Sequence, residues 1–170
     1  MRMKIQRWAL LGVLSAVMGL GLMAPAQAAG TTQISGSGYY DDAAGTECGT
    51  PPAGFADFTP LVLHGDLEGC LYTDTVTSKN SPSGVYQEVG RELIVASLNG
   101  GPLGTVTTNY RFEAKYDPDI FTGIEVKGRC QHPIAAGSGT GGFAGATGRL
   151  DFKDDVDNAV FYYRGHITLG

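Results

Sequence analysis

The alternation of apolar and polar side chains is the feature that most constrains the fold of this 170-residue chain. Its clearest example runs from Val106 to Tyr116, where mostly apolar residues at even positions alternate with polar residues at odd positions. Successive side chains of a β-strand point to opposite sides of a sheet, so a period of two predicts a strand with one buried and one solvated face. No helical period is evident beyond the first 28 residues, and an all-β protein is therefore expected.

The same alternation predicts further strands with turn residues between them. The predicted strands lie within residues 61–72, 85–98, 124–130, 149–153 and 161–169, and turn signals stand at 81–84, 99–102, 117–119 and 157–158. In the strand at 124–130, Ile124 and Val126 are expected to face inward and Glu125 outward. Short turns between strands predict an antiparallel meander, and closing it into a barrel protects its edges. We expect a closed antiparallel barrel of about eight strands, with a sandwich as the second choice.

The first 28 residues have the pattern of a secretory signal peptide. Basic residues precede an apolar run from Trp8 to Met23, and Ala26-Gln27-Ala28 follows it with small residues. The apolar run of about 16 residues is short of the roughly 20 that cross a bilayer. Cleavage after Ala28 is predicted, which would leave a secreted protein, extracellular or periplasmic. Residues 29–60, rich in Gly, Thr, Ala and Pro, are expected to form a loosely structured N-terminal arm, and residues 61–170 the barrel domain.

The charge of the chain bears on its partners. Removing the basic residues of the signal segment changes the formal charge from −5 to −8, and the remaining Lys and Arg are spread singly along the sequence. Without a basic cluster, neither a nucleic acid nor an anionic membrane surface is an expected partner. No cofactor is expected either.

Three cysteines follow the signal segment, and an oxidising compartment allows them one internal disulfide. Alternation places Cys130 on the inner face and Cys70 on the outer face, while Cys48 lies in the arm. A Cys48–Cys70 disulfide is therefore expected, with Cys130 as a buried thiol. The alternative is a Cys70–Cys130 pair, which would require a bulge at Gly69 that turns Cys70 inward.

The segment Gly137–Phe152 has the highest glycine density in the chain and contains a Gly-x-Gly-x-x-Gly pattern that begins at Gly137. A dinucleotide site would need a strand before this pattern and a helix opening on its last glycine. Here the alternating residues Gly148–Phe152 predict a strand instead. The glycines are therefore expected to form a connection between strands, which Phe143 anchors to the core.

This region also carries a resemblance to a known family. The run Gly139–Gly148, followed by a short strand and by Tyr163–Ile167, resembles the C-terminal part of the allene oxide cyclase and dirigent barrels over about 30 residues. The resemblance implies an eight-stranded antiparallel barrel with an apolar ligand in its lumen. It also implies a homo-oligomer and a protein that steers a reactive intermediate more than it attacks it.

Aromatic residues on the predicted inner faces are the candidate ligand-binding residues. They are Tyr110, Phe112, Tyr116, Phe152, Phe161 and Tyr163. These side chains either fill the lumen as packed core, as in most small barrels, or line a pocket for a small apolar molecule.

Glu88 and Glu92 are the candidate catalytic residues. Strand carboxylates usually face water. A bulge at Gly90 would turn one of them inward, where burial raises the pKa of a carboxyl group and fits it for acid–base chemistry. No metal site is expected, because the histidines stand singly, and Asp151, Asp154, Asp155 and Asp157 are expected to form a solvated acidic turn.

Three functions follow from these patterns. The first is the binding of a small apolar molecule in the lumen. The second is an isomerase or cyclase that confines a reactive substrate there, with Glu88 or Glu92 moving the proton. The third is a structural or interaction protein with a filled core, which acts through the apolar outer face near Leu93–Leu98.

Overall fold

The computed structural model describes residues 30–42 and 47–170, and the predicted signal segment lies outside the described residues. The described part contains nine strands and no helix, and thus no helix that could cross a membrane. The strands are β1 (Thr31–Tyr40), β2 (Leu61–Gly65), β3 (Leu67–Asn80), β4 (Val85–Leu98), β5 (Leu103–Asp117), β6 (Ile124–Pro133), β7 (Thr140–Gly141), β8 (Thr147–Asp155) and β9 (Val160–Thr168).

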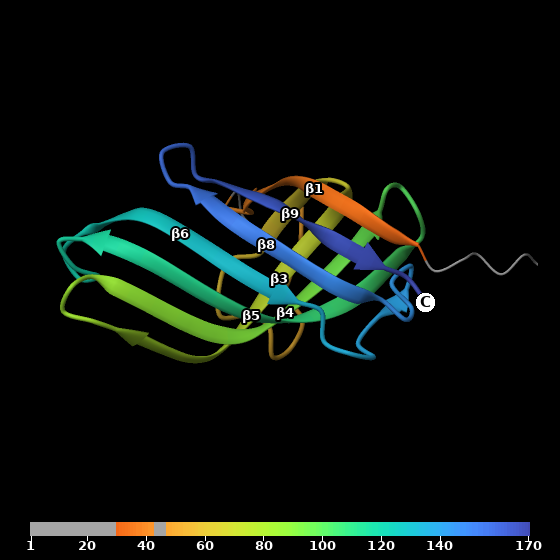
Figure 1. Cartoon of the computed structure of the whole chain (residues 1–170), viewed down its shortest axis with the longest axis horizontal. Coiled ribbons are helices and arrows are strands. Elements are labelled where there is room, and N and C mark those ends of the chain that lie inside the picture. Colours follow the sequence, from red (N-terminus) through yellow and green to blue (C-terminus); the bar gives the residue numbers. More distant parts are fainter. Residues whose placement is uncertain (1–29, 43–46) are drawn as a thin grey trace, which may run out of the picture.

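Eight of these strands close into an antiparallel barrel (Figure 1). Each strand pairs with the next around the barrel, and the pairing of β1 with β9 completes the circle. The two-residue strand β7 is extra and pairs with the start of β5. The predicted fold class, a closed meander barrel, is confirmed. Closure pairs each of the eight strands on both sides over part of its length, and β3 extends beyond its pairing with β2.

Part of the predicted N-terminal arm belongs to the barrel itself. Residues 31–40 form β1, which pairs with β2 on one side and with β9 on the other. The expectation of a loose arm over residues 29–60 is therefore wrong for this stretch. Sequence alternation missed the strand because Ile34 is its only aliphatic side chain larger than alanine, and a glycine occupies the next position on the same face.

The later part of the arm lies on the outside of the barrel and is fixed by a disulfide. Cys48 and Cys70 are bonded, with Cα atoms 5.6 Å apart, and Cys130 is a buried free thiol. This is the pairing expected from alternation. Cys70 stays on the outer face and is not turned inward at Gly69. Cys48 packs with Val62 and Tyr72 in a second apolar cluster, which Phe55 and Val95 adjoin. The arm thus covers part of the apolar outer face near Leu93–Leu98.

The predicted faces are confirmed along β5 and β9 but are wrong at the start of β6. Ile124 and Val126 are 74% and 49% exposed, whereas Glu125 lines the inside of the barrel. The pairing of β5 with β6 shifts register between Lys115 and Tyr116, so one extra residue of β6 is accommodated there. Because a bulge inserts a residue into one strand only, it inverts the faces beyond it.

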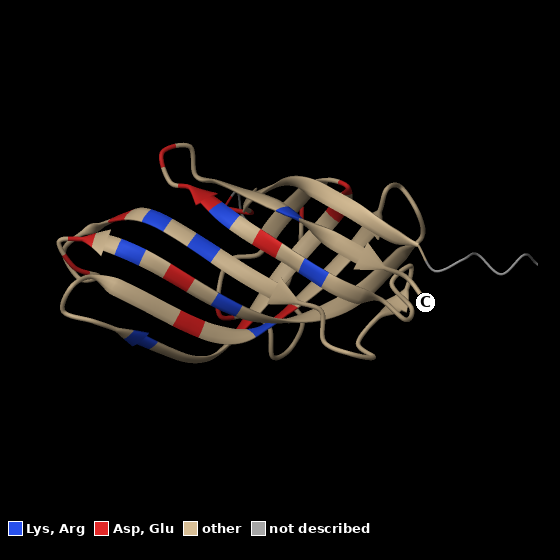
Figure 2. Ribbon diagram, viewed as in Figure 1, with Lys and Arg blue, Asp and Glu red and all other residues tan. Residues whose placement is uncertain are grey.

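Basic residues that stand apart in the sequence come together on the outside of the barrel. Figure 2 shows Lys and Arg alternating with acidic residues along β5 and β8, while β6, which lies between these strands, carries Lys127 and Arg129 in succession. Arg129 lies 3.4 Å from Glu113, and Arg149 lies 2.7 Å from Asp151. The basic side chains are therefore interleaved with acidic ones on this face, an arrangement that the sequence order does not reveal.

One end of the barrel is packed solid, and the glycine-rich connection closes it. Phe143, in this connection, is fully buried among core residues that include Leu67, Val106 and Leu150. The chain can approach β5 closely because a Cβ at Gly104 would overlap the backbone of residues 140–143. The glycines serve close backbone packing, and Phe143 anchors the connection as expected.

Candidate ligand-binding lumen

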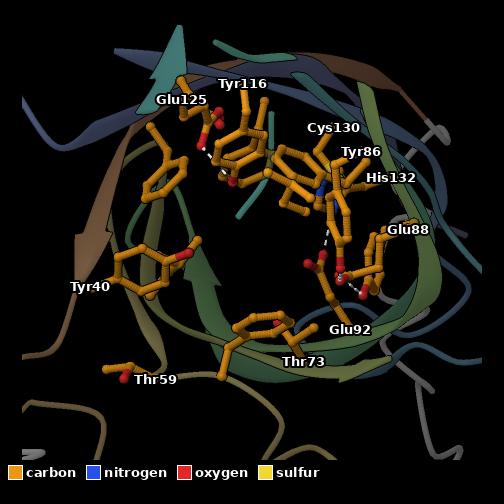
Figure 3. A pocket seen from close by; sticks show the side chains of 18 residues that line it. Tyr40, Thr59, Thr73, Tyr86, Glu88, Glu92, Tyr116, Glu125, Cys130 and His132 are labelled. Atoms are coloured by element: carbon orange, nitrogen blue, oxygen red, sulfur yellow. Dashed lines mark hydrogen bonds and ion pairs between the residues drawn. The ribbon is translucent and has the colours of Figure 1, made fainter. Parts of the chain in front are cut away.

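The other end of the barrel contains a cavity of about 360 Å³. It reaches the surface between Tyr40 and Phe58, which are 40% and 43% exposed. Figure 3 looks into this cavity. Its other lining residues are Thr59, Leu61, Thr73, Tyr86, Glu88, Glu92, Tyr110, Phe112, Tyr116, Ile120, Glu125, Cys130, His132, Phe152, Asp154 and Phe161.

Five of the six aromatic residues singled out from the sequence lie on this cavity, and Tyr163 does not. The Tyr163 hydroxyl accepts a hydrogen bond from the Leu67 amide at 2.8 Å and donates one to the His64 carbonyl at 3.1 Å. Burial raises the pKa of Tyr163 to about 12. Tyr163 thus belongs to the packed core and satisfies the hydrogen bonds of backbone groups where β2 passes into β3.

Glu88 and Glu92 both point into the barrel and are 5% and 6% exposed. No bulge at Gly90 is needed for this orientation, because β4 alternates regularly through both residues. The register shift lies in the partner strand β3, between Thr75 and Thr77. The usual placement of a strand carboxylate toward water does not apply to either residue.

Two tyrosines hold the Glu88 carboxylate. The Tyr86 hydroxyl donates to one of its oxygens and the Tyr110 hydroxyl to the other. Tyr110 lies directly opposite Gly90, and a Cβ at Gly90 would overlap the Tyr110 ring. Burial, followed by the hydrogen bond to Glu88, raises the pKa of Tyr110 well above its ordinary value. The two hydrogen bonds satisfy both oxygens of the Glu88 carboxyl group and orient its side chain.

Glu92 lies against His132, which comes from β6. Glu92 Oε2 and His132 Nδ1 are in ion-pair contact, but their alignment is not that of a hydrogen bond. His132 is 2% exposed, and its Nε2 atom has no hydrogen-bond partner. The ring stacks against Phe152 with centroids 4.7 Å apart. A histidine whose ring nitrogen is free beside a carboxylate is a typical arrangement of a general base and its orienting group.

Glu125 and Asp154 form a second acidic pair, which sequence reasoning missed. Both line the cavity, and Figure 3 places Glu125 across the lumen from Glu88 and Glu92. Burial, the hydrogen bond with Glu125 and repulsion from its carboxylate raise the pKa of Asp154 from 3.8 to about 7. One Glu125 oxygen is buried without a donor. Because ionised carboxylates only accept hydrogen bonds, a proton shared by the two groups satisfies this contact.

One member of this pair could have been found from the sequence. Asp154 lies two residues after Phe152 in the same strand and therefore shares its inward face. Of the aspartates expected to form a solvated turn, Asp157 is exposed, whereas Asp154 lies in β8 and lines the cavity. Glu125 gave no such signal, because the bulge opposite it inverts its face.

The lumen as a whole combines aromatic walls with carboxyl groups and one histidine. Among the residues that the structure describes, neither Lys nor Arg lines it. Within residues 30–42 and 47–170, no group of three His, Cys, Asp or Glu side chains is arranged to hold a metal ion. The arrangement can enclose a small molecule, exclude water from most of its surface and exchange protons with it.

Comparison of the chain with protein-family models, with curated proteins and with solved structures found no match.

Proposed function

We propose that the barrel binds a small, largely apolar molecule in its lumen. The observation that carries this proposal is the cavity of about 360 Å³ with aromatic walls, open at one end. Small barrels that only need a core fill it with their own side chains, as this chain does at its other end. Ligand pockets have cavity volumes of this order and the same mixture of apolar walls and few polar groups.

We place the chain beside the allene oxide cyclase and dirigent barrels as a proposed relative. The closed eight-stranded barrel and the passage of Gly139–Gly148 into β8 and β9 support this placement. The disulfide is compatible with an oxidising compartment, which supports export by the proposed signal segment.

The binding proposal can be tested with N-phenyl-1-naphthylamine, a neutral probe whose fluorescence rises in apolar surroundings. We expect saturable binding of one probe per barrel. Leu61→Trp reduces the lumen volume and should weaken binding by about tenfold or more, since an overfilled pocket must repack. Leu103→Trp is the matched control, because Leu103 is exposed and does not line the cavity. Absence of saturable binding, or equal binding by the two variants, would contradict the proposal.

A second candidate function is acid–base catalysis on the bound molecule, as in an isomerase or cyclase. The free Nε2 of His132 beside Glu92 favours it, because both groups lie on the cavity. The test uses 5-nitrobenzisoxazole, a neutral aromatic compound whose ring opens when a base removes its carbon-bound proton. The His132–Glu92 site should accelerate ring opening by about 100-fold or more over buffer.

Glu92→Gln should remove this acceleration, while the exposed Glu68→Gln should not. Ring opening at the buffer rate in the unaltered protein would rule out a positioned base in the lumen and would leave the binding proposal intact.

A further inference from the structure

The lumen has an unbalanced charge. Four carboxyl groups line it, from Glu88, Glu92, Glu125 and Asp154, and among the described residues His132 is the single lining group able to carry positive charge. Acidic groups thus outnumber basic groups in the lining by four to one. Carboxylates lose favourable hydration on burial and then need a partner of opposite charge. Within the lining, the structure offers no side chain for that role beyond the histidine.

The aromatic walls have the same preference for positive charge. The face of an aromatic ring is electrostatically negative and attracts ammonium groups, most strongly where water is excluded. Tyr40 and Phe161 pack edge to face at 5.1 Å on the open side of the lumen. The Tyr116 hydroxyl lies 3.4 Å from Glu125. Rings and carboxyl groups therefore stand together at the entrance to the lumen.

Buried polar atoms without partners give an independent sign of a missing ligand. Glu92 and His132 are both more than nine-tenths buried and line the cavity. Glu92 Oε2 and His132 Nδ1 contact each other, and His132 Nε2 has no hydrogen-bond partner among the described residues. Buried polar groups are nearly always satisfied in folded proteins, so exceptions that line a cavity indicate a ligand or water there.

These observations define the chemical class of the ligand more narrowly than the lumen-binding proposal does, and they rest on that proposal. We propose that the lumen takes a hydrophobic organic cation, an amine or quaternary ammonium compound, with its charged group beside Glu125 and Asp154. The apolar part of the molecule lies against Phe112 and Phe152.

Gly128 makes the acidic pair sterically feasible. A Cβ at this position would overlap the carboxyl groups of both Glu125 and Asp154. Glycine thus leaves room on the lumen face of β6 for two carboxyl groups at one place. A cation bound there would replace the shared proton as the group that offsets their repulsion.

The test compares three probes of similar shape by their displacement of N-phenyl-1-naphthylamine at pH 8. Benzyltrimethylammonium is the cation, neopentylbenzene is its uncharged isostere, and phenylacetate is an anion. We expect the cation to bind about tenfold or more tightly than the uncharged isostere and the anion not to bind, because only the cation gains from rings and carboxylates.

Paired variants locate the charged group. The double variant Glu125→Gln with Asp154→Asn should remove the preference for the cation while still binding the fluorescent probe. The matched control is Glu113→Gln with Asp157→Asn, which removes two carboxylates that do not line the cavity and should keep the preference. A second variant, Gly128→Ala, leaves every charge in place but displaces both carboxyl groups, and it should reduce the preference as well.

Equal affinity for the cation and neopentylbenzene would overturn the cation proposal while leaving lumen binding in place. Loss of the preference in the control pair would also overturn it. If the fluorescent probe itself does not bind to the unaltered protein, both the lumen-binding and the cation proposals fail together.

Discussion

The two ends of this barrel are built from the same strands, yet one is a packed core and the other an acidic, aromatic cavity. On β4, the lumen residues at the packed end are Ile94 and Ala96, and at the open end they are Glu88 and Glu92. On β8, Leu150 belongs to the packed end and Asp154 to the open end. Period-two alternation continues through both halves. The alternation determines which side chains point inward, and the residue types determine whether they fill the space.

The difference indicates that stability and function are divided along the barrel axis. The packed end buries large apolar side chains. Burial of apolar surface is the main source of folding free energy. The open end buries carboxyl groups and a histidine, which costs folding free energy unless a ligand compensates. Variants that treat the two ends separately can therefore test this division.

The largest effect is expected for Phe143→Ala. Phe143 is fully buried in the packed end, and removing its ring should lower the free energy of unfolding by about 3–5 kcal/mol. Phe112→Ala, at the half-buried wall of the cavity, should cost about half as much, because the ring already faces open space. Urea unfolding measures both. Equal losses would contradict the division between the ends.

Removing the disulfide should affect the open end more than the packed end. The double variant Cys48→Ser with Cys70→Ser should lower the free energy of unfolding by about 3 kcal/mol, through loss of the loop constraint on the unfolded chain. It should also weaken binding of the naphthylamine probe, since Phe58 and Thr59 of the arm line the cavity. The hydrogen-exchange rates of the Ala96 and Val106 amides should keep their rank among the amides of the protein. Preferential loss of protection there would mean that the arm supports the packed end instead.

The buried contact between Glu92 and His132 should contribute coupling energy to folding. Glu92→Leu alone should lower the free energy of unfolding by about 1–3 kcal/mol, because it leaves His132 buried without a charged partner. Glu92→Leu with His132→Leu should recover that loss or exceed the unaltered protein in stability. A double-mutant cycle in urea measures the coupling. If the two losses simply add, the contact between these residues carries no coupling energy.

A pH dependence of stability is expected from Asp154. Its pKa is raised from 3.8 to about 7 in the folded protein, so the folded chain holds a proton that the unfolded chain releases. Stability therefore falls as the pH rises from about 4 to about 7. Glu68, Glu113 and Asp119 have lowered pKa values, and their contributions are lost as the pH falls below about 4.5, so they leave the slope between about pH 5 and 7 unchanged.

Asp154→Asn should flatten this dependence, since the amide does not titrate and can donate a hydrogen bond to Glu125. The melting temperature of the variant should exceed that of the unaltered protein by a few degrees at pH 8 and by less at pH 5. Asp157→Asn should leave the profile unchanged because Asp157 is exposed. An unaltered slope in the Asp154 variant would assign the effect to another group.

Much of the candidate site could be predicted from the sequence, and its charge could not. Alternation placed Tyr110, Phe112 and Phe152 on the inner face, because the side chains of a regular strand repeat every second residue. The same rule applied to β8 would have placed Asp154 beside them. Glu125 was out of reach, because its orientation depends on a bulge in the pairing of β5 with β6.

The sequence by itself determined the all-β fold and the inner face of most strands, and it favoured the Cys48–Cys70 pairing over Cys70–Cys130. These properties are local, because side-chain direction repeats along each strand and a disulfide needs its cysteines on one side of the sheet. Only the tertiary structure decided that β1 closes the barrel, that one end stays open, and that four carboxyl groups meet there. Strand partners, register and unfilled volume depend on residues far apart in the chain, which no local pattern specifies.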